Sequence, residues 1–238
     1  MNSKAKKRIQ DVLGHIDLNI RKQAEEHEFS NKLIKDKNVV GWGLYNTQSN
    51  ELHRYYLYIK LKGNDTDKIL TVLMLNPSNT FPDREKNTLG EFDATVSNVI
   101  KIAQETKYSA LEVINLFSYI EGDSKKVTKK EYFTQKNKYY EINKTNNSFL
   151  KNLLNSIENP ILIAWGEKFK NTTRHKQVKE LIEILKTKNI YTFCKKEDGE
   201  CKQLKNKYPK HPGRIKDFTE KCIEKCHKSE FKLIKYIF

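Results

Sequence analysis

Residues 69–80 read ILTVLMLNPSNT, a run of seven apolar or β-branched residues that ends at Asn76-Pro77-Ser78-Asn79. A run of this kind, bounded by turn formers, predicts a strand buried on both faces, as parallel sheets require. Three later runs have the same form: LEVINLF (111–117), PILIAWG (160–166) and NIYTFC (189–194). Ligands of open α/β sheets bind at the carboxyl ends of the strands, so we expect the polar residues at these ends to share one site.

The segments between these runs predict the rest of the fold. Helices are expected after Asp93 and over residues 146–157, 172–188 and 215–227, and a closing strand over 231–238. Alternating strands and helices imply right-handed crossovers. We therefore expect an α/β fold, a three-layer α/β/α sandwich around a mostly parallel four-stranded central sheet.

The N-terminal residues predict an addition to this core. Residues 1–37 look helical, with Gly14 and Asn19 as interruptions, and residues 39–45 and 53–61 predict a β-hairpin. We expect residues 1–62 to form a helix and hairpin that pack on an α/β domain of residues 63–238, with a single core overall. Residues 81–92 predict a polar loop that is long enough to have a function.

The chain is strongly basic, with 45 Lys and Arg against 30 Asp and Glu, a net charge of +15 and a pI of about 9.4. This balance favours a polyanionic partner, nucleic acid first and an anionic membrane surface second. The alternative is the free use of Lys and Asn that an AT-rich genome produces. Because no apolar stretch approaches the roughly 18 residues of a membrane span and residues 1–10 lack a signal peptide's apolar core, we expect a cytoplasmic protein without a membrane partner. We also expect a monomer.

Four cysteines lie in the last fifth of the chain: Cys194, Cys201, Cys222 and Cys226, the last followed by His227. Their spacings, C-x6-C and C-x3-C-H, do not match a zinc knuckle or ribbon. Structural or free thiols are the favoured interpretation, and a loose metal site is the alternative. A reducing cytosol disfavours disulfides. We expect no cofactor and no metal.

Four short polar motifs follow or accompany the predicted strands: Asn76-Pro77-Ser78, Asn115, Trp165-Gly166 and His211-Pro212-Gly213-Arg214. In this order they resemble the uracil-DNA glycosylase superfamily, and the first is most similar to the N-P-G motif of its mismatch-specific and single-strand-selective branches. The sequence also resembles a bacterial and phage family of unknown function with LNPS, NLF, AWG and HP elements, over roughly residues 50–214. Two positions depart from the superfamily: Met74 replaces a glycine, and Ser78 ends the N-P-G motif.

The resemblance implies a role for each motif, and the chemistry of the side chains agrees. Asn76 can orient a water but cannot accept its proton, so stabilisation of the leaving base by a donor such as His211 would supply most of the rate. Asp93 is either a helix cap or a carboxylate that assists the water. Asn115 can read the Watson–Crick edge of a flipped base. The remaining base contacts would come from Pro77, Ser78, Trp165 and either Phe92 or Phe81, and the DNA contacts from Arg174, Lys210, Gly213, Arg214 and Ile215.

Each motif also has a structural interpretation. Asn76 and Asn115 are residue types that make local backbone hydrogen bonds at turns and strand ends, and His211 is compatible with a plain loop histidine. Trp165 fits the core, and Asp93 fits an N-cap. The basic and aromatic residues of 118–139 fit either a solvated helix face or a contact with a nucleic-acid backbone.

The leading prediction is a metal-independent DNA glycosylase that flips a modified pyrimidine and leaves an abasic site. We expect it to be monofunctional, because no lysine stands out as a Schiff-base nucleophile. The uracil-restricted branch places a tyrosine where Ser78 stands, so the resemblance implies space for a bulky C5 group such as hydroxymethyl or its glucosylated form. Repair, or defence against phage DNA with modified cytosines, would suit that activity. A nucleoside or nucleotide hydrolase and a non-catalytic nucleic-acid-binding module are the alternatives.

Overall fold

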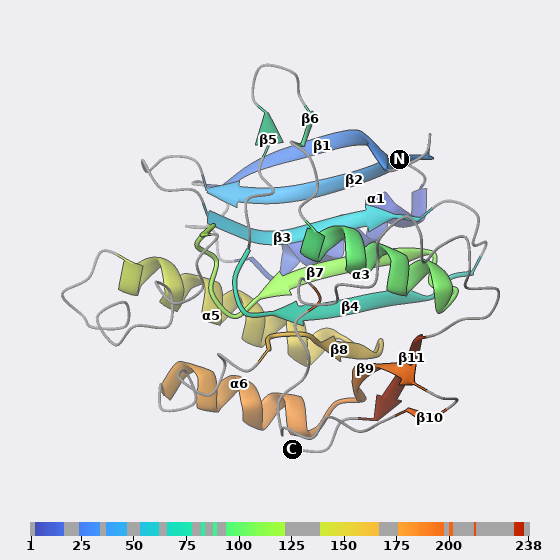
Figure 1. Cartoon of the computed structure of the whole chain (residues 1–238). Coiled ribbons are helices and arrows are strands. Elements are labelled where there is room, and N and C mark those ends of the chain that lie inside the picture. Colours follow the sequence, from blue (N-terminus) through green and yellow to red (C-terminus); the bar gives the residue numbers. More distant parts are fainter. Residues whose placement is uncertain are drawn as a thin grey trace.

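The computed structural model describes residues 3–16, 24–33, 37–46, 53–61, 66–77, 82–83, 88–89, 94–121, 139–166, 176–197, 200–201, 212 and 231–235. Nine strands form one sheet in the order β1-β2-β3-β7-β4-β8-β9-β10, with β11 paired to β9 (Figure 1). They are β1 (Ala24–Leu33), β2 (Lys37–Asn46), β3 (His53–Lys60), β4 (Ile69–Met74), β7 (Ala110–Asn115), β8 (Ile161–Ile163), β9 (Ile190–Glu197), β10 (Glu200–Cys201) and β11 (Phe231–Lys235).

The sheet is mixed. Strand β4 pairs in parallel with β7 and with β8, and β8 pairs in parallel with β9. Antiparallel strands extend this centre on both sides, with β3, β2 and β1 beyond β7 and with β10 and β11 beside β9. The predicted α/β fold is confirmed, but the central sheet is larger and more mixed than the four-stranded, mostly parallel sheet that the apolar runs predicted.

The helical prediction for residues 1–37 is correct only at its start. Helix α1 (Ser3–Gly14) is followed by strand β1, which pairs with β2 through all ten of its residues. The sequence of β1, AEEHEFSNKL, has no apolar alternation, so its backbone pairing with β2 decides its structure. Charged residues are typical of edge strands, which they protect from pairing with other chains. The predicted hairpin of residues 39–45 and 53–61 is confirmed as β2 and β3.

Within the predicted loop of residues 81–92, β5 (Pro82–Asp83) and β6 (Thr88–Leu89) form a separate two-stranded sheet. The predicted helix of residues 215–227 lies outside the described residues. So do residues 122–138, which hold most of the basic and aromatic stretch.

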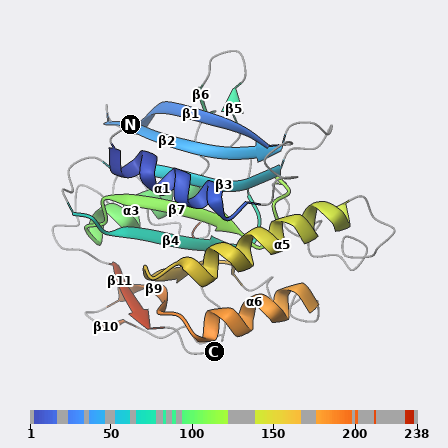
Figure 2. The ribbon, with the colours of Figure 1, turned by 180° about the vertical axis from the view of Figure 1, so that it is seen from behind.

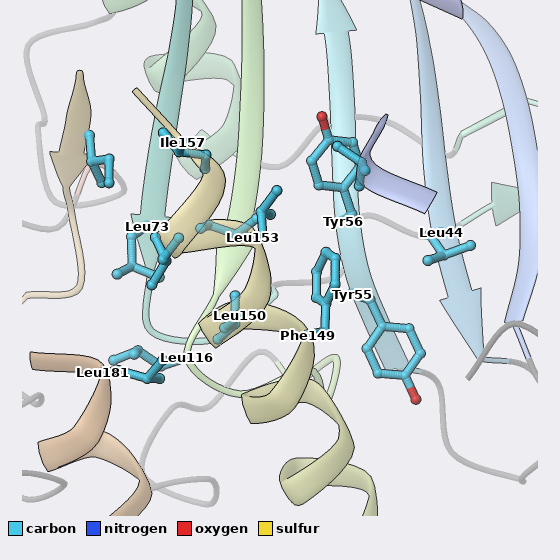
Figure 3. Packing of buried hydrophobic residues seen from close by; sticks show 14 of the residues in the cluster. Leu44, Tyr55, Tyr56, Leu73, Leu116, Phe149, Leu150, Leu153, Ile157 and Leu181 are labelled. Carbon is cyan, nitrogen blue, oxygen red and sulfur yellow. The ribbon is translucent and has the colours of Figure 1, made fainter. Parts of the chain in front are cut away.

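Helices cover both faces of the sheet, which gives three layers. One face carries α1, α5 (Tyr139–Ser156) and α6 (Lys176–Lys186), and the other carries α3 (Ala94–Glu105) (Figures 1 and 2). On the first face, leucines of α5 and α6 pack against side chains of the sheet such as Tyr56 and Leu73 (Figure 3). On the second face, Val96, Val99 and Ile100 of α3 pack against the sheet.

One irregularity in β3 bears on the site. Tyr56 pairs with Leu44 and Arg54 pairs with Tyr45, so Tyr55 is an extra residue in β3, a β-bulge. Tyr55 and Tyr56 both belong to the core on the α5 face (Figure 3). Residues opposite each other in a sheet share a face, and Tyr45 belongs to the core on the α3 face. The bulge therefore places Arg54 on the α3 face.

An ion pair between half-buried Arg8 and fully buried Glu112 joins α1 to the middle of the sheet. The guanidinium of Arg8 donates to both carboxylate oxygens of Glu112, at 2.5 and 3.0 Å, and the Thr71 hydroxyl also donates to this carboxylate at 3.0 Å. Glu112 lies on β7 and is fully buried. Burial lowers the pKa of Arg8, but the hydrogen bond and charge of Glu112 outweigh burial and raise it. This network tethers the N-terminal helix to the strand that ends at Asn115.

Candidate functional site

Two predicted site asparagines lie at the carboxyl ends of neighbouring parallel strands. Asn115 is the last residue of β7 and pairs in register with Met74, the last residue of β4. Asn76 follows Met74 by two residues. The chain continues side by side beyond both strands, because the amides of Leu116 and Phe117 donate to the carbonyls of Met74 and Leu75 at 3.0 and 2.9 Å. The structure therefore brings the two motifs together at one edge of the sheet.

The amide of Asn76 is fixed by the backbone around it. Its Nδ2 donates to the carbonyls of Pro77 at 3.0 Å and Glu121 at 2.7 Å, and the amide of Glu121 donates to the Pro77 carbonyl at 3.1 Å. Asn76 thus makes the local backbone hydrogen bonds that are expected of an asparagine at a turn. They also decide the orientation of the side chain, because both Nδ2 hydrogens are used and Oδ1 remains as the acceptor. Asn76 is half-buried.

The amide of Asn115 is fixed by a buried cation. Its Oδ1 accepts a hydrogen bond from Nη2 of Arg54 at 3.4 Å. Asn115 is 1% exposed and Arg54 is 0% exposed. The Nδ2 of Asn115 is buried and has no hydrogen-bond partner among the described residues. A buried amide donor without a partner costs free energy, so this group is suited to donating to an acceptor on a ligand.

Tyr45 lies beside Arg54 on the α3 face, opposite it in the β2–β3 pairing. Its ring lies against the backbone of Gly43, where an added Cβ would come within 2.4 Å of the ring. Burial raises the pKa of Tyr45 to about 12, although the positive charge of Arg54 acts in the opposite direction. At neutral pH the phenol is therefore uncharged, and Arg54 is the charged group of this pair.

The histidine-proline motif is held against α3. Asn98 of α3 is 6% exposed, and its Nδ2 donates to the carbonyl of Pro212 at 2.8 Å. Asn98 is a buried residue of α3 between Val96 and Val99 in the chain, and both valines pack in the core on the α3 face together with Val113 of β7. Asn115 follows Val113 by two residues and shares its face. Pro212 is thus held on the face of the sheet that carries the side chains of Asn115 and Arg54.

Trp165 lies elsewhere. It is 1% exposed and belongs to the core on the α5 and α6 face, with Ile161 and Ile163 of β8. Gly166 follows it with a φ of 76°, a left-handed conformation that favours glycine. The structure therefore does not place Trp165 on the face of Asn115. Pro77, which follows Asn76, is buried in the turn.

The other predicted site residues lie outside the described residues. They are Ser78, Phe81, Phe92, Asp93, Arg174, Lys210, His211, Gly213, Arg214 and Ile215. Pro212 is the described neighbour of His211 and Gly213.

Sequence reasoning missed several polar residues at this edge. Arg54 belongs to the predicted hairpin strand of residues 53–61, where nothing marks it as a site residue, yet it is buried beside Asn115. His53 is also buried, and its Nδ1 lies 3.0 Å from Oγ of Ser118. Three asparagines of α5 complete the set: Asn143, Asn146 and Asn147. The sequence signal that could have found these asparagines is their spacing. Each stands seven residues before a leucine of the buried stripe of α5, and therefore on the same side of the helix.

Among the described residues no group of three or more His, Cys, Asp or Glu side chains is placed to hold a metal ion. Of the cysteines, Cys194 and Cys201 lie in β9 and β10, whereas Cys222 and Cys226 are outside the described ranges. No helix in the described part of the chain has the length and apolar character needed to cross a membrane.

The fold and the site define a mixed α/β protein with a buried polar site at the carboxyl ends of its parallel strands. Residues 54–213 match the model of a family described as a protein of unknown function (DUF1643), and the chain belongs to this family. The matched segment begins at Arg54 and contains Asn76, Asn115 and Pro212. No curated protein and no solved structure shows significant similarity to the chain.

Proposed function

We propose that this protein is a monofunctional DNA glycosylase that hydrolyses the N-glycosidic bond of a modified pyrimidine. The observation that carries the proposal is the pair of oriented amides, Asn76 and Asn115, at adjacent strand ends. One retains an acceptor and the other a donor. Hydrolysis of an N-glycosidic bond needs both, an acceptor that positions water and a donor that recognises the departing base.

In the proposed reaction the Oδ1 of Asn76 accepts a hydrogen bond from the attacking water. The water oxygen bonds to C1′ of the sugar, the C1′–N1 bond breaks, and its electron pair leaves with the base. The proton of the water passes to solvent or to the departing base, because an amide does not accept it. Fixing Nδ2 on two carbonyls makes this orientation the resting one, so no reorganisation is needed when water binds.

Asn115 would recognise the base. Its Nδ2 donates to a carbonyl oxygen or ring nitrogen of the flipped pyrimidine, which supplies the partner that the described residues do not. Arg54 keeps the amide in this orientation through Oδ1. The buried charge of Arg54 also favours the negative charge that develops on the leaving base, because charges interact strongly where water is excluded.

His211 would donate to the carbonyl oxygen of the leaving base. Its support is indirect, through the bond from Asn98 that holds the neighbouring Pro212 on the face of Asn115. The net charge of +15 supports DNA as the substrate, because lysines and arginines that contact phosphates release counterions on binding. Ser78 at the end of the first motif supports a base with a large C5 substituent.

The experiment is base release from DNA in the presence of EDTA. Single- and double-stranded oligonucleotides would carry one uracil, 5-hydroxymethylcytosine or glucosylated hydroxymethylcytosine. Free base is detected by mass spectrometry and the abasic site by alkaline cleavage. We expect release from at least one substrate, and Asn76→Ala should lower the rate about 100-fold or more, the usual effect of a misplaced reacting group, without weakening DNA binding. Asn155→Ala, at an exposed position of α5, is the matched control.

Lack of release from every substrate by the wild-type protein would refute the proposal. Tight, salt-dependent DNA binding without release would then identify a binding module. Release of base from free nucleosides, with no effect of salt on the rate, would instead identify a nucleoside hydrolase.

A further inference from the structure

The buried face of α5 changes character along the helix. Ile157, Leu150 and Asn143 are spaced by seven residues, as are Leu153 and Asn146 and also Leu154 and Asn147. Positions seven apart lie on the same side of a helix. The aliphatic members pack in the core against the sheet (Figure 3). The three asparagines are 3%, 0% and 7% exposed, so amides stand at positions where the pattern calls for leucine.

These amides are not satisfied within the described part of the protein. Both side-chain polar atoms of Asn143 and the Oδ1 atoms of Asn146 and Asn147 are buried without a hydrogen-bond partner among the described residues. Buried polar atoms in proteins nearly always have a partner. Leaving them unpaired incurs their full cost of desolvation, which leucine would avoid. Three such positions in one stripe point to a ligand rather than to packing.

The asparagine row, Asn143, Asn146 and Asn147, lies at the same edge of the sheet as the candidate site. The Nδ2 of Asn146 donates to the carbonyls of Asn115 and Leu116, at 3.1 Å each. The row therefore lies against the end of β7, on the face opposite the Asn115 side chain. Asn143 is one turn nearer the start of the helix, about 4.5 Å farther along its axis and away from Ile157 at the other end. A ligand that contacts both the Asn115 side chain and the row must therefore pass the carboxyl end of β7 from one face of the sheet to the other.

The chemistry of the row indicates what it binds. The four unpartnered atoms include three carbonyl oxygens, which only accept, and one amide nitrogen, which donates. The Nδ2 of Asn146 donates to two carbonyls, so the unpartnered atom of this side chain is its oxygen. A phosphate or carboxylate offers acceptors alone and would oppose these oxygens. Hydroxyl groups each offer one donor and accept as well, so they complement a row of neutral amides.

We propose that the asparagine row recognises hydroxyl groups on the C5 substituent of the target base. This inference rests on the proposed glycosylase function and names its substrate class as hydroxyl-bearing pyrimidines. The two sources of such hydroxyls are a hydroxymethyl group and a hexose attached to it. Asn115 would read the ring of the base, and the row would read the substituent.

The test compares four duplexes that differ in one base: cytosine, 5-methylcytosine, 5-hydroxymethylcytosine and glucosylated hydroxymethylcytosine. The variant Asn143→Leu/Asn147→Leu extends the leucine stripe and leaves Asn146 in place. We expect its rate on the preferred hydroxyl-bearing base to fall about 10- to 100-fold, the effect of two or three lost hydrogen bonds, while its rate on 5-methylcytosine is unchanged or higher. The midpoint of thermal unfolding should rise. Asn155→Leu, the same change at an exposed position, is the control.

The outcomes separate the two proposals. Base release by the wild-type protein with the same substrate ratios in the double variant would overturn the inference and leave the glycosylase function intact. A wild-type rate on 5-methylcytosine equal to its rate on both hydroxyl-bearing bases would also overturn it. Lack of release from the four duplexes and from uracil would overturn both. If the double variant fails to fold, Asn147→Leu alone gives the same comparison. The hydroxymethyl and glucosylated substrates then show which hydroxyls the row binds.

Discussion

Replacing Arg8 by leucine should destabilise the protein far more than loss of an ordinary ion pair. Glu112 is fully buried and its two oxygens accept from Arg8 at 2.5 and 3.0 Å, so Arg8→Leu leaves a buried carboxylate that keeps the Thr71 hydroxyl but has lost its cation. Breaking a buried pair in this way costs about 3–5 kcal/mol. The free energy of unfolding of a whole domain is roughly 5–15 kcal/mol. For a chain of this size the loss corresponds to about 6–20 °C in the unfolding midpoint.

The assay is urea unfolding of Arg8→Leu, Glu112→Leu and the double variant, followed by circular dichroism. The double variant should be close to the wild-type protein in stability, because replacing both partners removes the unpaired charge. Lys186→Leu is the control, since Lys186 and Glu183 form a 2.7 Å pair with side chains 48% and 69% exposed. An exposed pair of this kind contributes about 0–1 kcal/mol. A loss in Arg8→Leu no larger than in Lys186→Leu would refute the reasoning, and so would a double variant as unstable as the sum of the two single ones.

Two further predictions follow from the candidate site. Burial raises the pKa of Tyr45 from 10.0 to about 12, so between these values the unfolded chain releases a proton that the folded chain keeps, and stability falls by about 2–3 kcal/mol as pH rises. Tyr45→Phe should make the dependence of urea midpoints on pH less steep between about 10 and 12, and an unchanged slope would contradict the assignment. Asn98→Ala removes the donor to Pro212 and should slow base release several-fold with a loss of about 1–3 kcal/mol in stability, whereas an unchanged rate would show that His211 does not depend on this contact.

The elements that sequence predicted correctly are those whose hydrophobic pattern is complete within the segment. Strands β4, β7, β8 and β9 are short apolar runs, and α3 carries its buried stripe in its own spacing. Strand β1 has no such pattern, because an edge strand is determined by the backbone groups that its neighbour offers. The sequence also did not predict that the sheet is larger than four strands and mixed, because the pairing of its outer strands likewise depends on the backbone groups of their neighbours.

The site was predictable in part. Asn76 was found because turn formers follow its apolar run, and Asn115 because it is a polar residue within the next apolar run. Strand order then places both at one edge of the sheet. Arg54 was not found, because its burial depends on a bulge in β3 and on contact with another strand. The asparagine row was visible as a break in the leucine stripe of α5, but the break has meaning only when burial of those positions is known.

The β-bulge at Tyr55 decides on which face of the sheet the charge of Arg54 lies. If β3 alternated regularly with Tyr55 in place, Arg54 would share the α5 face with Tyr56, because residues two apart in a strand lie on one face. Deleting Tyr55 would remove the bulge and place Arg54 directly before Tyr56, so Arg54 would remain opposite Tyr45 on the α3 face in the present register. With Tyr55 present, the bulge rather than the side chain of Tyr55 keeps the guanidinium next to the amide of Asn115. Substitutions at Tyr55 that preserve the bulge should therefore leave Arg54 in place.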